Sequence, residues 1–296
     1  MNLDHLNYYP LKDGKFPPSS AIMKRWSTLP ESQKEIFQNG PGRDLYMTNK
    51  TRCRKELHKY YQGAEEGVNL KPIREFILTE LYRYFDRHYE ITPASVGKDW
   101  FDIAAMNVME DMVIVHQPEG GEDRVIRIHL CQPYGWSAEW AIGKSFAEIH
   151  DEVKKADGRH VIREPSRMVD SLIRMSEPIQ RVGALSFRPD LIINLHPDQI
   201  REDDWHWRDD QKLYLRFERQ VVVPFPEIRC FLFTIRPYFV DVSLPGKIEA
   251  CISALENVHK DSYPREWINS RGQKALEFLK GKKDAQSLPR YRFHFG

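Results

Sequence analysis

A histidine interrupts an apolar stripe in the segment GKSFAEIHDEV, residues 143–153. If this segment is helical, Phe146, His150 and Val153 share one face. The imidazole then has two interpretations. It is either an ordinary histidine near a helix C-terminus, where the helix dipole favours it, or a nitrogen ligand directed at a metal. Spacing alone leaves both open.

A second pattern whose residues could take part in catalysis or binding is a polar row on the predicted strand LYLRFERQVVV, residues 213–223. A two-residue period places Arg216, Glu218 and Gln220 on one face, opposite an apolar face that Arg219 interrupts. Such a row is either a solvated or ion-paired sheet face, or the wall of a polar pocket in which an arginine holds Glu218. Periodicity does not decide between them.

Further titratable residues surround a predicted hairpin. Glu110 and Asp111 stand at the entrance of its first strand, where acidic side chains commonly serve as capping or turn residues. His116 and His129 lie on its two arms, so an iron site built from histidine and carboxylate ligands is an alternative there. No HExxH, P-loop, GxGxxG or GxSxG motif is present, so zincin, nucleotide-binding and α/β-hydrolase functions lack support.

The elements that must position these residues follow from periodicity and turn residues. An extended arm is expected over residues 1–47. Helices are expected at 48–62 and 71–90, from Ser137 through His150, and at 164–177, 247–260 and 274–281. Strands are expected at 111–117, 124–132, 179–187, 190–197, 212–223 and 228–242. The last of these is apolar on both faces, which predicts a central position in the sheet.

This order of elements predicts an α+β fold with a mostly antiparallel sheet and not alternating βαβ units. We expect an N-terminal arm and helices over residues 1–100 that pack on the core, a core over 101–245, and a C-terminal helical extension over 246–296. Together they are expected to form one compact unit.

Composition narrows the class of protein. With 44 basic and 43 acidic side chains the net charge is +1, which argues against a general binder of nucleic acid or acidic membranes. No apolar run approaches the roughly 18 residues that cross a bilayer, and the N-terminus lacks a secretory pattern. The four cysteines form no CxxC pair, so neither a zinc ribbon nor a disulfide framework is indicated. We expect a soluble cytoplasmic protein with reduced thiols.

Three segments together resemble one family, the heme-dependent oxidative N-demethylases, which include the oxygenase subunit of dimethylamine monooxygenase. Residues 110–153 are similar to the family's Glu-Asp strand, hairpin and Ile-His region. Residues 177–187 resemble its Pro-x-x-Arg stretch. Residues 213–238 are very close to its Arg-x-Glu-Arg-Gln and Phe-Thr-Ile-Arg-x-Tyr strands, the most specific element.

The resemblance, which spans about residues 100–242, implies a PAS-like antiparallel sheet that serves as a heme b oxygenase domain. It implies a monooxygenase reaction in which O2 oxidises a small secondary or tertiary amine, such as dimethylamine, to the shorter amine and formaldehyde. Electrons would come from NADPH through a separate reductase that carries FMN and a 2Fe-2S cluster.

Site residues are implied by the same match. His150, aligned with the family's Ile-His element, is the implied axial ligand of the heme iron. Glu218 is the implied carboxylate that orients the ammonium group of the substrate and aids its deprotonation. Asp111 is the second candidate for that task.

Arginines complete the implied site. Arg216, Arg219 and Arg236 are implied to bind heme propionates or to fix the carboxylate. One departure stands out: after Arg181 the family pattern has an Asn-Trp pair where this chain reads VGALSF, residues 182–187. The departure implies a reshaped pocket.

Two alternatives belong to other functional classes. The first is a heme-binding PAS gas sensor, or a binding protein without turnover. Sensors normally carry an output domain, and the sequence indicates none. The second alternative is a scaffold protein that has lost heme.

Overall fold

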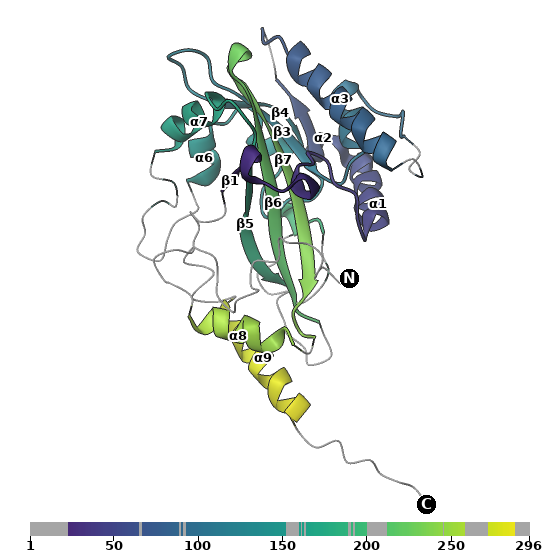
Figure 1. Ribbon diagram of the computed structural model, residues 1–296, viewed down its shortest axis with the longest axis vertical. Coiled ribbons are helices and arrows are strands. Elements are labelled where there is room, and N and C mark those ends of the chain that lie inside the picture. The colour runs from purple at the N-terminus through teal and green to yellow at the C-terminus, as the bar shows by residue number, and fades with distance from the viewer. Residues whose placement is uncertain are drawn as a thin grey trace, which may run out of the picture.

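A seven-stranded antiparallel sheet, counted over the described residues, organises the protein in the computed structural model (Figure 1). The structure describes residues 23–64, 67–88, 90, 93–151, 160, 162, 164–188, 191, 193–199, 212–244, 246–257 and 272–287. The strands are β1 Lys24–Arg25, β2 Tyr61–Gly63, β3 Asp111–His116, β4 Arg124–His129, β5 Ile179–Arg188, β6 Tyr214–Phe225 and β7 Cys230–Asp241. Their spatial order is β1-β5-β6-β7-β3-β4-β2. The predicted α+β class with an antiparallel sheet is confirmed.

Helices cover both faces of this sheet. They are α1 Arg43–Cys53, α2 Leu57–Tyr60, α3 Lys71–Arg87, α4 Trp100–Ala105, α5 Ala138–Ala141, α6 Phe146–His150, α7 Pro165–Ile173, α8 Ile248–Glu256 and α9 Gly272–Ser287. In Figure 1, α1, α2 and α3 lie on one side of the sheet, α6 and α7 on the other, and α8 and α9 at one end.

Alternation along the strands divides the apolar side chains between these layers. Ile114 and Val221 pack with α3 and α4, so we call their side of the sheet the α3 face. Val113 and Val222 pack with α7, and we call that side the α7 face. Each face is buried, because the side chains that point to either side of the central strands are largely apolar in the middle of the sheet.

The longest strands, β6 and β7, pair along their whole length from Tyr214 with Asp241 to Phe225 with Cys230. Strand β7 stands fourth of the seven, which confirms the central position predicted from its apolar faces. The hairpin of β3 and β4 is also confirmed, with a register shift between Ile114 and Val115.

Helix α3 forms as predicted. Pro72 occupies its first turn, and Ile73, Ile77, Leu81 and Tyr84 are buried along one stripe. The helix predicted at 48–62 is wrong in its bounds. Helix α1 already begins at Arg43 after Gly42, and the chain passes through α2 into β2 by residue 61.

Two further expectations need correction. The helix predicted from Ser137 through His150 is two short helices, because Gly143 adopts a φ of 77° between α5 and α6. The strand predicted at 190–197 is absent from its described part. Leu195 makes only an isolated bridge with Tyr134, and a 3-10 turn follows at Pro197–Gln199.

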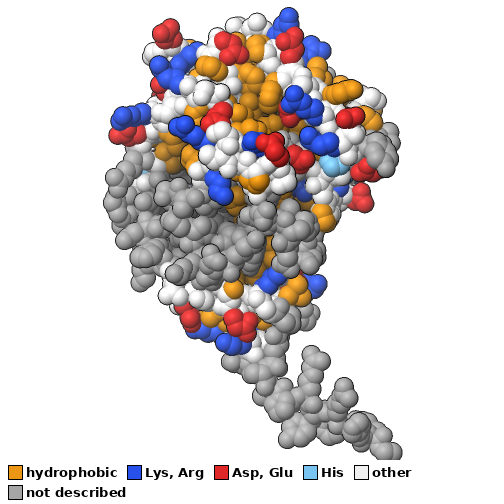
Figure 2. All heavy atoms as spheres, in the orientation of Figure 1, with side chains coloured by type: hydrophobic (Ala, Val, Ile, Leu, Met, Phe, Trp, Pro, Cys, Tyr) orange, Lys and Arg blue, Asp and Glu red, His pale blue; other side chains and the backbone are white. Residues whose placement is uncertain are grey.

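The described surface is mixed in charge. Figure 2 shows Lys and Arg side chains interspersed with Asp and Glu over the visible face, in line with a net charge of +1. None of the helices in the described part of the chain has both the length and the apolar character that crossing a bilayer requires.

Candidate functional site

His150 ends the five-residue helix α6, which is held by a reciprocal cap. The Oγ of Ser145 accepts from the backbone N–H of Glu148 at 3.2 Å, and the Glu148 carboxylate accepts from the Ser145 backbone N–H at 2.7 Å. A helix this short is marginal by itself. The cap and the packing of Phe146 and Ile149 on the α7 face therefore fix the position of His150.

The orientation of the His150 ring is set by its own helix. Nδ1 lies 2.9 Å from the carbonyl oxygen of Phe146, and the Phe146 ring stacks on the imidazole at 4.0 Å between centroids. A carbonyl oxygen can only accept, so Nδ1 carries the proton and Nε2 keeps its lone pair. Burial lowers the pKa of His150 against the opposing effect of the bond to the Phe146 carbonyl, and the positive charge of Arg181 lowers it further, which favours the neutral imidazole.

The predicted polar row lies on the α7 face of β6, the face on which α6 also packs, and is linked end to end. Nη2 of Arg216 donates to Oε1 of Glu218 at 2.6 Å. Nε2 of Gln220 donates to the other carboxylate oxygen at 2.7 Å. Nη1 of Arg181, on β5, donates to Oε1 of Gln220 at 3.2 Å. The row is thus ion-paired, and Arg181 connects it to the surroundings of His150.

Gly183 makes room for this arrangement. It is registered directly opposite Glu218 on β6. A Cβ built on Gly183 would lie 3.2 Å from the Nε and Nη2 atoms of Arg181. The Arg181 side chain therefore lies across the glycine, in the stretch where the chain departs from the expected Asn-Trp pair. Val182, on the opposite face, packs in the core beside α8.

At the other end of the row, buried polar atoms have no partner. Within the described residues, Nε of Arg216 and Oγ of Ser186 make no hydrogen bond although both atoms are inaccessible to solvent. The two residues are registered opposite each other on β6 and β5. The Tyr134 ring lies under the Arg216 guanidinium at 5.2 Å and under that of Arg188 at 4.6 Å. Unpaired buried donors are expensive, so this end of the row suits an acceptor group from a ligand.

Asp111 is fully buried and bonded to backbone. Its carboxylate oxygens accept from the N–H groups of Cys131 at 2.9 Å and of Gln132 at 2.8 Å. Burial raises the pKa of Asp111 to about 6 against the opposing effect of Lys50, and the nearby Glu218 carboxylate raises it too. Asp111 therefore fixes the turn after β4 and stands close to the polar row.

Arg219 and Arg236 lie on the opposite, α3 face, where they are registered against each other. Arg219 donates to Gln180 Oε1 at 2.7 Å and to the backbone oxygen of Glu35 at 2.5 Å. Arg236 lies over the ring of Tyr46 at 4.3 Å. The structure thus brings Arg216, but neither of these two, to the side of the sheet that carries Glu218.

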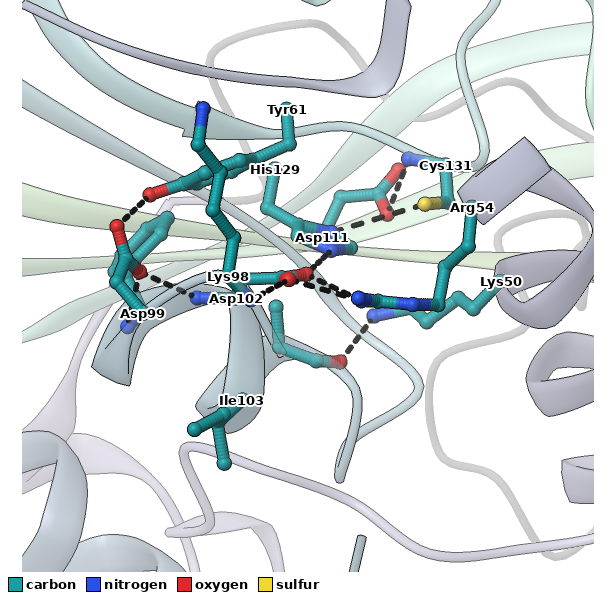
Figure 3. A network of polar contacts seen from close by, with 12 residues as sticks. Lys50, Arg54, Tyr61, Lys98, Asp99, Asp102, Ile103, Asp111, His129 and Cys131 are labelled. Carbon is teal, nitrogen blue, oxygen red and sulfur yellow. Dashed lines mark hydrogen bonds and ion pairs between the residues drawn. The ribbon is translucent and has the colours of Figure 1, made fainter. Parts of the chain in front are cut away.

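A separate buried polar network lies under α4 on the α3 face (Figure 3). Nε2 of His129 lies 3.1 Å from Asp102 Oδ1, and both oxygens of Asp102 accept from Arg54 at 3.0 and 2.9 Å. His116 is registered at the far end of the hairpin, opposite Arg124. The two hairpin histidines are therefore not brought together.

Fold and site define an α+β protein whose antiparallel sheet carries a buried charged row on the same face as a short histidine-bearing helix. The family model described as "Haem-dependent oxidative N-demethylase, alpha subunit-like" matches residues 52–265, and the chain belongs to this family. Its description indicates heme dependence, an oxidoreductase of the oxidative N-demethylase kind, and one subunit of a larger assembly. No match to a curated protein was found.

Several contributors to the site were not predicted. The sequence places Arg181 in the Pro-x-x-Arg stretch but predicts no contact for it, and Gly183 belongs to the segment VGALSF that departs from the family pattern. Their proximity to Glu218 depends on the register of β5 with β6, which shifts between Gly183 and Ser186. The contact of Asp102 with His129 could not be predicted, because the two residues are distant in sequence and no local pattern links them.

Proposed function

We propose that this chain is the heme-binding oxygenase subunit of an amine N-demethylase. The observation that carries the proposal is the geometry of His150, whose Nδ1 is bonded to Phe146 so that Nε2 is left as a ligand atom. Family membership supplies the expectation of heme. We further propose that the sheet, with helices on both faces, is a modified PAS-like domain.

Heme fits the residues of this face. A histidine that serves as an axial ligand must present a neutral, fixed imidazole nitrogen, and a hydrogen bond from the second nitrogen to a backbone oxygen is a usual way of fixing it. Phe146 and Ile149 supply apolar surface for the porphyrin. The unpaired Nε of Arg216 and Oγ of Ser186 are donors suited to propionate carboxylates. When bound, heme b would supply an iron centre that activates O2 with electrons from outside the chain.

Glu218 is proposed to hold the substrate. A secondary amine such as dimethylamine is an ammonium ion at neutral pH, and a buried carboxylate binds it far more strongly than a neutral side chain does. The Glu218 carboxylate accepts one bond from Arg216 and one from Gln220, which leaves acceptor capacity for a further N–H. It would orient the ammonium and accept its proton.

The other residues of this region are proposed to have roles other than binding the amine. Asp111 is 0% exposed and its two bonds with backbone N–H groups fix the turn after β4, whereas Glu218 is 7% exposed, so we assign the amine to Glu218 and not to Asp111. Arg219 and Arg236 lie on the α3 face, and we propose that Arg219 anchors the segment containing Glu35. Arg181 is proposed to shield the amine site from the side of Gly183.

A subunit without reducing cofactors needs an electron source. We propose a partner reductase that carries FMN and a 2Fe-2S cluster and draws on NADPH. The support is the alpha subunit-like description of the family and the resemblance of residues 110–153 and 213–238.

Spectroscopy and turnover test the proposal in two stages. The protein reconstituted with hemin is expected to show a Soret band and one heme per chain. Dimethylamine should then perturb this band, and with a flavin and iron–sulfur reductase it should stimulate NADPH oxidation and release formaldehyde. Failure to retain heme would refute the whole proposal, whereas heme retention without any response to amines would leave a heme-binding sensor.

A further inference from the structure

Three metal-ligating side chains meet at the end of the β3–β4 hairpin, next to the Arg216 end of the polar row. The ligand atoms of Asp111, His129 and Cys131 all lie within 4.8 Å of one another. All three residues are buried, with relative exposures of 0%, 0% and 1%. His129 ends β4, and Cys131 follows two positions later in the bend after the strand. Figure 3 shows the Asp111 carboxylate and the Cys131 thiol beside the His129 ring.

The His129 ring is oriented for ligation by a carboxylate behind it. Asp102 Oδ1 lies 3.1 Å from Nε2, and Asp102 is itself held by two bonds from Arg54. The Asp102 carboxylate is an acceptor, which places the imidazole proton on Nε2 and leaves the lone pair on Nδ1. A carboxylate–histidine pair of this kind is the arrangement that orients histidine ligands in zinc sites. This pair is an observation independent of the three-ligand cluster.

The spacing of the donors suits a single small cation. Nδ1 of His129 lies 3.7 Å from Sγ of Cys131. Tetrahedral zinc with a Zn–S bond of about 2.3 Å and a Zn–N bond of about 2.05 Å separates its two ligand atoms by about 3.6 Å. The two side chains thus stand at the separation that a shared zinc ion imposes.

We propose that Asp111, His129 and Cys131 form a buried structural zinc site. A thiolate, an imidazole and a carboxylate are a donor set that zinc accepts, and full burial is typical of a structural site and not of a catalytic one with an open position. Cys53 packs beside this cluster, with its Sγ 3.7 Å from the backbone oxygen of Cys131.

Binding of zinc replaces one proton. The S–H bond of Cys131 breaks, a Zn–S bond forms, and the proton leaves to solvent, so no oxidant or reductant is needed. One thiolate and the Asp111 carboxylate then balance the two positive charges of zinc. Lys50 stays outside the site, because its Nζ donates to the backbone oxygens of Ala105 at 2.7 Å and Glu110 at 2.5 Å.

The site would tie the two strands of the hairpin together, because Asp111 begins β3 and His129 ends β4. Zinc would then have a role in stability that is separate from that of heme, which we place on the α7 face with α6. The inference therefore does not depend on the proposed function.

Elemental analysis of the full-length protein, purified after growth in zinc-supplemented medium, tests the proposal. About one zinc per chain is expected, whatever the heme content, and a chelator that removes it should lower the thermal midpoint, with recovery when zinc is added back. Zinc absent from the purified protein, together with no uptake by the chelated protein on addition of zinc chloride, would overturn the proposal. In that case the cluster is a hydrogen-bonded network balanced by Lys50.

Matched variants locate the ion. Cys131→Ser and His129→Gln are expected to lose zinc, whereas Cys230→Ser, which alters another buried thiol, should keep it. Because the first two variants can fail to fold, cobalt is added to chelated wild-type protein as a second probe. Thiolate-to-cobalt absorption is expected from ligation by Cys131. Stoichiometric zinc that persists in folded Cys131→Ser, or cobalt binding without thiolate absorption, contradicts the assignment.

Discussion

The imidazole of His150 is bonded by the residue one turn before it: Nδ1 lies 2.9 Å from the carbonyl oxygen of Phe146, whose ring also stacks on the imidazole. Both contacts come from within α6, a helix of five residues. The ligand geometry of Nε2 therefore depends on the integrity of one helical turn and on what caps it.

Removing the cap of α6 tests this dependence. Ser145→Ala deletes the hydroxyl that accepts from the Glu148 N–H, and the loss should be about 1 kcal/mol of unfolding free energy. Heme affinity should fall about tenfold, the lower end for loss of groups that orient a metal ligand. Thermal unfolding and a hemin titration measure the two effects.

Ser137→Ala is the matched control, because Ser137 caps the neighbouring helix α5, which carries no proposed ligand. It should lower stability by a similar amount and leave heme affinity unchanged. Equal heme affinity in the two variants would mean that the α6 cap does not position His150.

Glu218→Gln tests the proposed amine site. The amide keeps the shape of the carboxylate but removes its charge, so the dissociation constant for dimethylamine should rise about 10- to 100-fold. Heme content should not change. The measurement is the amine-induced change in the heme spectrum, with Glu139→Gln, a half-exposed carboxylate on α5, as the control. If amine affinity is the same in both variants, Glu218 does not bind the ammonium group.

Gly183 offers a graded test of the space over Glu218. Gly183→Ala places a Cβ 3.2 Å from the Arg181 guanidinium, a flexible group that can shift, so we expect a stability change below about 1 kcal/mol. Gly183→Trp should displace Arg181 from Gln220 and weaken amine binding. An unchanged amine titration in a folded Gly183→Trp protein would show that this space is not part of the site.

The packing of α3 on the sheet predicts different costs at adjacent positions. Ile77 is 0% exposed and Leu78 is 49% exposed. Ile77→Ala should lower the unfolding free energy by about 2–5 kcal/mol, and Leu78→Ala should change it by no more than about 0.5 kcal/mol. Chemical denaturation of both variants measures the difference, and similar losses would contradict the orientation of this helix.

Periodicity predicted those parts of the fold that depend on neighbours along the chain. The alternation of β6 gave the polar row on one face and Arg219 on the other, because a strand fixes which side each side chain takes. The stripe of α3 and the central place of β7 follow from the same local reasoning.

Periodicity could not predict which residues pair between strands or elements that are far apart in the sequence. The contact of Arg181 with Gln220 requires that β5 pair with β6 in one particular register with an irregularity after Gly183. The pairing of His129 with Asp102 likewise joins a strand to a helix far away in sequence. The boundary between α5 and α6 was missed because Gly143 breaks a segment whose apolar spacing is still helical.

Heme binding by His150→Ala tests the central claim most directly. The wild-type protein, titrated with hemin, should give a Soret band and retain heme through gel filtration, whereas folded His150→Ala should lose it, with partial recovery of the spectrum on addition of free imidazole. A folded His150→Ala protein with wild-type heme content and an unchanged spectrum would contradict the assignment of His150 as the iron ligand.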